Sequence, residues 1–451
     1  MSLFDGIAVE TRFPQGLVVE PGVEGAGAPL GNTTVLASTS MDTAFQKSGR
    51  KGRRLAVDHA AIVRHQYELL DFLYEKLPDP GQGYDEKEKK WKRVPGIRWR
   101  VRSCKRIPVM GGDVEVIRSS EGKVHYGGLN KCDSVWTCPV CSSRVAGFRR
   151  QELSTAIETN DCWVALSTFT VRHSMQDQLG DLIKIVRTAY RSMRSGRHWE
   201  AVVDAFGLVG SYTAMEFTWS RDNGWHPHLH ALDVFREELD EEQRRAFREM
   251  VNALWIHAIE MATGRAISKG KGEWQHGYSF TPSLSSNMAL VQAFYAVKWG
   301  SSEEQWTGLM KRKAARSSSG HVVMEVTGSL TKQGRVLDGV HYSTWELLDI
   351  AAEGSVDAWQ LWFEFAQATR NLHQGSWSRG LRGWLGLGVE VPDADVPDAG
   401  EDPEVVATID YKDWFSVLRS KHRGEVLQLA ARGGTSEEVC SYVDWVCGRG
   451  R

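Results

Sequence analysis

Three histidines, His226, His228 and His230, occupy alternate positions in one short stretch of the chain. If the stretch is a β-strand, residues two apart point to the same face, so the three imidazoles form one row. Imidazole is the commonest metal-binding side chain, and two on one face can share a divalent cation. The spacing therefore predicts a metal site.

A turn signal, Asp222-Asn223-Gly224, directly precedes the histidines and follows a strand-like run, 211–220. A three-residue hairpin loop with glycine in the left-handed position pairs Arg221 with Trp225. That register sets Glu216 opposite His230. One face then carries the polar residues Glu216, Thr218, Ser220, His226, His228 and His230. The other face carries Met215, Phe217, Trp219, Leu229 and Ala231.

A two-residue Asn-Gly loop would mix these two sets, because a one-residue slip exchanges the faces. The clean segregation favours the longer loop and brings the Glu216 carboxylate to the imidazoles, as a Mg²⁺ or Mn²⁺ site requires. Two other interpretations stay open. The histidines are simply solvated, or they supply three nitrogen ligands to a zinc hydrolase.

Tyr295 and Lys298 are i, i+3 neighbours on a predicted helix, 286–299. A phenol with a pKa of about 10 needs help to attack phosphorus, and both Lys298 and a bound metal stabilise a phenolate. An interfacial tyrosine beside a snorkelling lysine is the other interpretation of this pair. Tyr278 is the nearest alternative nucleophile.

Cys138 and Cys141 have the spacing of a zinc knuckle, with Cys132 just upstream and Cys104 as a plausible fourth thiolate. Four thiolates around tetrahedral Zn²⁺ make a closed structural site. Unliganded structural cysteines are the alternative, and a redox Cys-x-x-Cys is disfavoured because no thioredoxin-like strand–helix context surrounds it. Three arginines early in the next helix are candidate phosphate contacts: Arg144, Arg149 and Arg150.

The chain has 451 residues, with 55 basic and 57 acidic side chains. Nucleic-acid contacts must therefore come from local patches, such as the basic run 47–54 that contains Arg53 and Arg54. The N-terminus lacks the pattern of a signal peptide, and no apolar run approaches the roughly 18 residues of a membrane span. These features predict a cytoplasmic protein, in which seven cysteines favour metal ligands and free thiols over disulfides.

Periodicity predicts helices at 58–75, 143–159, 175–194 and 237–261, strands at 162–171 and 274–280, and a hairpin at 207–235. This order is typical of an α+β domain with a mainly antiparallel sheet. The predicted segments are a disordered arm, 1–53; a helix with the four-cysteine module, 54–150; the α+β domain, 151–335; a helical extension, 336–390; an acidic linker, 391–404; and a helical tail, 405–451.

These motifs together resemble the rolling-circle replication initiators of Gram-positive, especially actinobacterial, plasmids. Those proteins belong to the HUH endonucleases, named for a His-hydrophobic-His motif that His228-Leu229-His230 matches. Segments 166–173, 294–299 and 377–382 resemble the family's first motif, its nucleophile motif and a segment that often follows. The resemblance covers roughly 95–390. One departure is Val291, which stands where some relatives carry a glutamate used in termination.

The resemblance implies an HUH-type antiparallel sheet flanked by helices, and an enzyme that nicks one strand of a plasmid origin. Tyr295 would form a 5′-phosphotyrosine, leave a 3′-OH primer and later rejoin the strand. Mg²⁺ or Mn²⁺ would bind His228, His230, Glu216 and His226. The implied partners are origin DNA, single-stranded or in a hairpin, a host helicase and a DNA polymerase. The alternatives are a single-strand transposase or relaxase, and a non-catalytic zinc-finger DNA-binding regulator.

Overall fold

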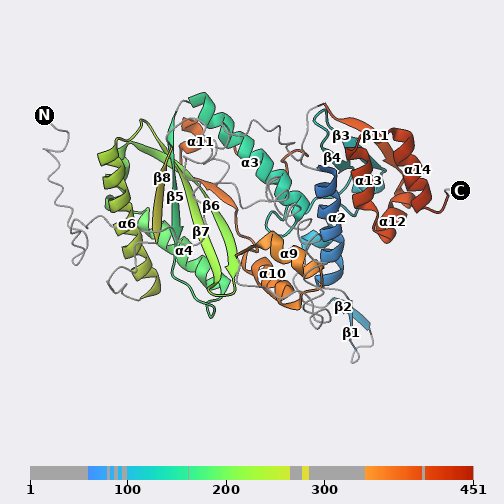
Figure 1. Cartoon of the computed structure of the whole chain (residues 1–451), viewed down its shortest axis with the longest axis horizontal. Coiled ribbons are helices and arrows are strands. Elements are labelled where there is room, and N and C mark those ends of the chain that lie inside the picture. The colour runs from blue at the N-terminus through green and yellow to red at the C-terminus, as the bar shows by residue number, and fades with distance from the viewer. Residues whose placement is uncertain are drawn as a thin grey trace, which may run out of the picture.

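The computed structural model describes residues 59–78, 82–85, 90–93, 99–160, 162–264, 277–283, 341–398 and 402–449. The predicted arm, with Arg53 and Arg54, and the predicted tyrosine helix, with Tyr295 and Lys298, lie outside the described residues. Every described strand pairing is antiparallel. The predicted α+β class with a mainly antiparallel sheet is therefore confirmed (Figure 1).

The larger sheet has the strand order β10-β6-β7-β5-β8, and β9 also pairs with β6. Its core is the long hairpin of β6 and β7, which covers most of the predicted hairpin at 207–235. The strands are β5 (Trp163–Thr170), β6 (Leu208–Ser220), β7 (Gly224–Phe235), β8 (Tyr278–Pro282), β9 (Tyr342–Ser343) and β10 (Gly375–Trp377).

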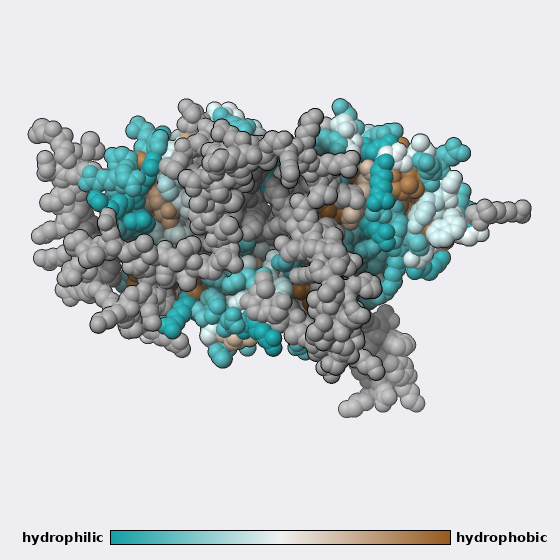
Figure 2. Space-filling view, viewed as in Figure 1, coloured by the Kyte–Doolittle hydropathy of each residue, from teal (hydrophilic) through white to brown (hydrophobic). Residues whose placement is uncertain are grey.

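Helices cover the apolar face of this sheet through aromatic contacts. The ring of Phe169 on β5 lies 5.0 Å from that of Trp255 on α6, and Phe217 on β6 lies 5.6 Å from Phe365 on α10. Where it is visible in Figure 2, the surface around α6 is largely hydrophilic. The helices around the sheet are α4 (Leu179–Met193), α5 (Arg197–Phe206), α6 (Glu241–Thr263), α9 (Thr344–Ala352), α10 (Val356–Ala368) and α11 (Leu381–Trp384).

Helix α6 begins four residues later than predicted, because Asp240 caps it. The Asp240 side chain accepts a hydrogen bond from the backbone of Gln243, whose side chain in turn accepts one from the Asp240 backbone. This capping box satisfies N–H groups at the start of the helix, so the acidic residues before Asp240 stay outside it. The sequence also missed α5, a short amphipathic helix directly before β6.

A second sheet pairs a strand near the C-terminus with two strands from the first third of the chain. Its strand order is β11-β3-β4, so the tail pairs with a strand almost 300 residues upstream. Figure 1 shows α2 next to the C-terminal helices. The elements of this module are α2 (His59–Lys76), β3 (Val114–Arg118), β4 (Val124–Gly127), α3 (Pro139–Asn160), β11 (Glu404–Ile409), α12 (Tyr411–Ser420), α13 (Arg423–Ala431) and α14 (Ser436–Val446).

Two short strands and two 3₁₀ turns complete the described secondary structure: β1 (Gln82–Asp85), β2 (Lys90–Arg93), η1 (Arg100–Ser103) and η2 (Val109–Gly111). Within the described part of the chain, no helix combines the length and the apolar character that crossing a membrane requires.

Arg423 holds the second module together. Its side chain is fully buried, and its Nη2 lies 2.6 Å from Asp71 Oδ1 on α2 while Nη1 donates to the carbonyl of Lys105 at 2.8 Å. Asp71 Oδ1 also accepts a hydrogen bond from Arg106 Nη1 at 2.8 Å. Although sequence analysis divided 54–150 from 405–451, these segments share one core, and the tail contains a strand as well as helices.

Arg423→Ala is expected to lower the free energy of unfolding by about 3 kcal/mol, because it removes one partner of a buried ion pair while Arg106 still neutralises Asp71. Urea denaturation of the full chain measures this. Lys412→Ala, an exposed change on α12, is the control and should cost less than about 0.5 kcal/mol. Equal midpoints for the two variants would contradict the structural role of Arg423.

Candidate functional site

The register of the β6–β7 hairpin differs from the prediction by two residues. Ser220 pairs with Gly224, so the loop is 221–223, and the predicted pairing of Arg221 with Trp225 is wrong. Glu216 consequently lies opposite His228 rather than His230. Gly224 explains the shift. It takes up its positive φ of 74° as the first residue of β7, where a Cβ would lie 2.9 Å from the Ser174 carbonyl oxygen.

The predicted faces survive this shift, because side chains alternate with a period of two and a two-residue slip returns each to its own face. The apolar set is buried, as expected: Met215, Phe217, Trp219, Leu229 and Ala231. Glu216 and the histidines share the other face.

Glu216, His228 and His230 meet in one group. One ligand atom from each lies within 4.8 Å of the other two. Glu216 Oε2 reaches diagonally to His230 Nε2 at 3.0 Å, and Thr168 Oγ1 on β5 lies 3.0 Å from His230 Nδ1. Thr168 therefore orients the His230 ring with Nε2 toward the carboxylate, as residues that contact metal ligands commonly do. A carboxylate with two imidazoles is a donor set that fits a divalent cation.

His226 lies beside this group. Its Nε2 is 3.1 Å from His228 Nε2, and its ring centroid is 4.4 Å from that of His173. Burial, together with the neighbouring His228 and His173, lowers the pKa of His226 to about 2, which keeps the ring neutral. Its role as a ligand stays a prediction. His173, whose Nδ1 lies 2.8 Å from the Asn223 carbonyl, was not predicted to take part, although it ends the conspicuous segment 166–173.

Tyr278 faces away from the histidines. It pairs with Phe169, its ring is 4.9 Å from the Phe169 ring, and its hydroxyl is 3.1 Å from Ser167 Oγ on the same face. Burial raises the pKa of Tyr278 well above its ordinary value. Both the position and the pKa therefore argue against Tyr278 as the alternative nucleophile.

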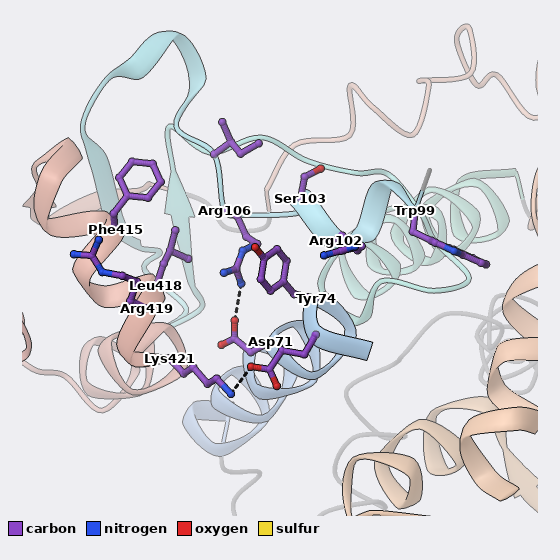
Figure 3. A pocket seen from close by; sticks show the side chains of 12 residues that line it. Asp71, Tyr74, Trp99, Arg102, Ser103, Arg106, Phe415, Leu418, Arg419 and Lys421 are labelled. Carbon is purple, nitrogen blue, oxygen red and sulfur yellow. Dashed lines mark hydrogen bonds and ion pairs between the residues drawn. The ribbon is translucent and has the colours of Figure 1, made fainter. Parts of the chain in front are cut away.

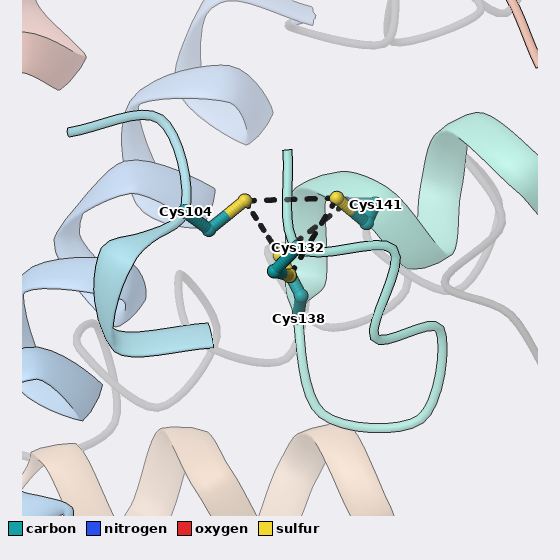
Figure 4. A group of neighbouring side chains, drawn as sticks. All are labelled: Cys104, Cys132, Cys138 and Cys141. Carbon is teal, nitrogen blue, oxygen red and sulfur yellow. Dashed lines mark hydrogen bonds between the residues drawn. The ribbon is translucent and has the colours of Figure 1, made fainter. Parts of the chain in front are cut away.

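The four cysteines converge in the second module (Figure 4). Cys104 follows η1, Cys132 lies in the loop after β4, and Cys138 and Cys141 bracket the first turn of α3. All four are buried and free, with Sγ–Sγ distances of 3.6 Å for Cys104–Cys141 and Cys104–Cys138, and 3.7 Å for Cys132–Cys141. Four sulfurs about 2.3 Å from one tetrahedral Zn²⁺ would be separated by about 3.8 Å. The predicted cluster therefore has the dimensions of a zinc site.

Backbone N–H groups and neighbouring thiols surround the sulfurs of this cluster. The backbone N–H of Ser134 donates to Cys132 Sγ and that of Cys141 to Cys138 Sγ, each at 3.4 Å. Hydrogen bonds from the other three thiols hold the pKa of Cys141 well below its ordinary value, whereas burial raises the pKa values of Cys132 and Cys138. Backbone N–H groups aimed at sulfur stabilise the charge that zinc ligation requires.

The predicted phosphate contacts of Arg144 and Arg149 need correction. Both side chains are buried, and they bind the segment that was predicted to be an acidic linker. Arg144 pairs with Asp133 at 2.8 Å and donates to the Asp393 carbonyl at 2.9 Å, while Arg149 pairs with Asp393 Oδ1 at 3.2 Å. Both guanidinium groups are therefore held in ion pairs within the protein. Arg150 is half-buried, and its DNA contact stays a prediction.

Known proteins of Streptomyces are similar to parts of this chain. The chain is 26% identical over 375 residues to "Protein rep" of Streptomyces lividans, which covers 68% of this chain and 76% of that protein. It is 30% identical over 152 residues to "Neomycin resistance protein" of Streptomyces cyanogenus, covering 27% of this chain and 35% of that protein. No family model and no solved structure matches. The resemblance to Rep proteins predicted from the motifs is confirmed.

Glu216→Gln should weaken Mn²⁺ binding by about tenfold, because it removes the charged ligand while keeping the side chain's size. Isothermal titration of Mn²⁺ into the full chain measures the change. Thr218→Ala, two residues along the same face, is the matched control and should bind as the parent does. Equal affinities of the parent and Glu216→Gln would remove Glu216 from the site.

Cys138→Ser should release about one zinc per chain and lower the melting temperature by about 5–15 °C, because a structural zinc site contributes folding free energy directly. Elemental analysis and thermal denaturation measure both effects. Cys440→Ser, an exposed cysteine on α14, is the control and should change neither. Parent protein that is folded yet zinc-free would rule the site out.

Proposed function

We propose that the chain is a plasmid replication initiator that nicks one strand of its origin through a tyrosine and later rejoins it. The observation that carries this proposal is the group of Glu216, His228 and His230 on the polar face of the β6–β7 hairpin. Similarity to a Rep protein over two thirds of the chain supports the same function. A His-hydrophobic-His motif on an inner strand of an antiparallel sheet supports the HUH type.

Glu216, His228 and His230 would hold Mg²⁺ or Mn²⁺, with His226 next to them. The ion would polarise the scissile phosphate, which is the chemistry that a divalent metal supplies in phosphoryl transfer. Thr168 fixes the orientation of the His230 ring. The hairpin holds the carboxylate and both imidazoles on strands rather than on loops, so the ligand atoms are pre-positioned.

Tyr295 would supply the nucleophile. Its phenol oxygen attacks phosphorus, the bond from phosphorus to the 3′ oxygen breaks, the phenol loses its proton and the departing 3′ oxygen gains one. The products are a 5′-phosphotyrosine and a 3′-OH that primes synthesis. Lys298, three residues later in the sequence, would stabilise the phenolate. Because the covalent bond keeps the phosphodiester energy, attack by a 3′-OH rejoins the strand without ATP.

This function requires several partners in the cytoplasm. Origin DNA must be single-stranded or extruded as a hairpin where Tyr295 attacks, a host helicase must unwind the duplex, and a DNA polymerase must extend the 3′-OH. The four-cysteine module would hold Zn²⁺ and help to bind the origin. A single-strand transposase or relaxase would use the same chemistry on other DNA.

A non-catalytic zinc-finger regulator is the second candidate, and the buried four-cysteine group favours it. The two functions differ in one product. A regulator binds DNA without forming a covalent bond to it, whereas the proposed initiator forms an adduct that survives denaturing electrophoresis.

Tyr295→Phe should reduce nicking and adduct formation at least about a thousandfold, because the phenylalanine lacks the attacking oxygen. The assay incubates the full chain with Mn²⁺ and single-stranded oligonucleotides that span the origin, followed by denaturing electrophoresis. His230→Ala should also lose metal-dependent cleavage, whereas Tyr278→Phe, on the opposite face of the sheet, should keep it. A Tyr295→Phe variant that cleaves normally would sink the assignment. A parent protein that binds the origin but forms no adduct would favour the regulator.

A further inference from the structure

A cavity of about 630 Å³ lies between the end of α2, the η1 segment and α12 (Figure 3). Its size is in the range of ordinary ligand sites. The half-exposed ring of Tyr74 lies near its centre, with the guanidinium carbon of Arg106 3.7 Å and that of Arg102 5.1 Å from the ring centroid. Phe415 lines the cavity from α12. The lining thus combines aromatic rings with arginines.

Positive charge is in excess here. Four cationic side chains line the cavity, Arg102, Arg106, Arg419 and Lys421, against the two carboxylates of Asp71 and Glu75. Each carboxylate already pairs with a lining cation, Asp71 with Arg106 at 2.8 Å and Glu75 with Lys421 at 2.6 Å. The net positive charge of the lining favours an anion, and the cluster of Tyr74 with its two arginines offers a stacking surface to a flat group.

A second hollow of about 450 Å³ is also lined by η1 and shares Ser103 with the first. Its lining is also basic, with Arg100, Lys131 and Arg370 around Cys132. Arg100 pairs with Asp133 at 3.1 Å and Lys131 lies 3.5 Å from Asp398, so Arg370 is the lining cation that the proposal uses here. A single phosphate or nucleotide would fill one hollow and leave the other. A ligand that uses both must be an extended polyanion.

We propose that these two hollows form one track that binds a segment of single-stranded DNA, with a base stacked at Tyr74 and phosphates along the arginines of η1. Backbone phosphates on a basic groove and bases on aromatic rings are the chemistry of single-strand binding, and a stacked base must be unpaired. In a chain with balanced overall charge, DNA contact has to come from a local patch of this kind. The inference rests on the proposed function and names a DNA-binding surface away from the Glu216 group.

The four-cysteine cluster supports the track. Cys104 ends the η1 turn that carries Arg100 and Arg102, and Cys132 lines the second hollow. The cluster therefore determines where η1 lies between the two hollows.

The test measures fluorescence anisotropy of a labelled oligonucleotide of about 20 nucleotides with the full, zinc-loaded chain. No Mg²⁺ or Mn²⁺ is added, so that cleavage plays no part. Tyr74→Ala should weaken binding by about tenfold, while Tyr74→Phe, which keeps the ring, should retain it. The double variant Arg102→Gln/Arg370→Gln should reduce the slope of log K against log salt by about 1.4, or about 0.7 for each lost phosphate contact. Arg187→Gln/Arg191→Gln, at two exposed positions on α4, is the charge-matched control and should change neither quantity.

Unchanged affinity and salt slope in the Tyr74 and arginine variants, with melting temperatures like the parent's, would overturn the proposal. A loss confined to duplex DNA would overturn its single-strand part. Competition by free dAMP as strong as by the oligonucleotide would replace the track with a mononucleotide site. These outcomes are separate from the proposed function, because failure to form an adduct leaves the binding assay intact.

Discussion

The antiparallel pairing of β6 with β7 is the constraint on which the candidate metal site depends. Alternation along these strands puts Phe217 and Leu229 under the helices and turns Glu216, His228 and His230 to the opposite face. A one-residue slip would exchange the two faces, so that Glu216 and the imidazoles would lie against the helices and the aromatic rings would leave the core, at a large cost in buried apolar surface. The free energy of the core therefore selects the face that carries the ligands.

Hydrophobic burial alone does not exclude a two-residue slip, and this is why the predicted register was wrong while the predicted faces were right. A buried polar cluster distinguishes the two registers. Asp233 on β7 accepts Ser167 Oγ from β5 at 2.6 Å and Ser211 Oγ from β6, and Arg194 donates to Ser211 Oγ at 2.8 Å. A slip would separate these partners and leave polar groups buried without hydrogen bonds, which is costly. Asp233 is itself fully enclosed, and this burial raises the pKa of its carboxyl group.

The features that sequence predicted well are local ones. Periodicity located α2, α4 and β5 to within a few residues, and the spacing of Cys138 and Cys141 identified a cluster that the fold brings together. The features that it missed are pairings between distant segments. Nothing near Glu404–Ile409 indicates that this strand completes a sheet with β3, and the exposure expected for Arg144 ignored an acidic partner segment some 250 residues away.

The lining of the proposed DNA track could not be predicted from the sequence either, because it comes from distant segments: α2, η1, Arg370 and α12. Hydrogen bonds connect the end of η1 to α2 through α13: Cys104 adjoins Lys105, whose Nζ donates to the Tyr126 carbonyl at 2.8 Å and whose own carbonyl accepts a hydrogen bond from Arg423. Arg423 in turn binds Asp71, one helical turn from Tyr74. Loss of the four-cysteine cluster would therefore loosen η1 and its contacts with α13 and α2 together, while the Glu216 group remains on a separate sheet. In the proposed function, binding and cleavage of DNA would thus depend on separately stabilised parts of one chain.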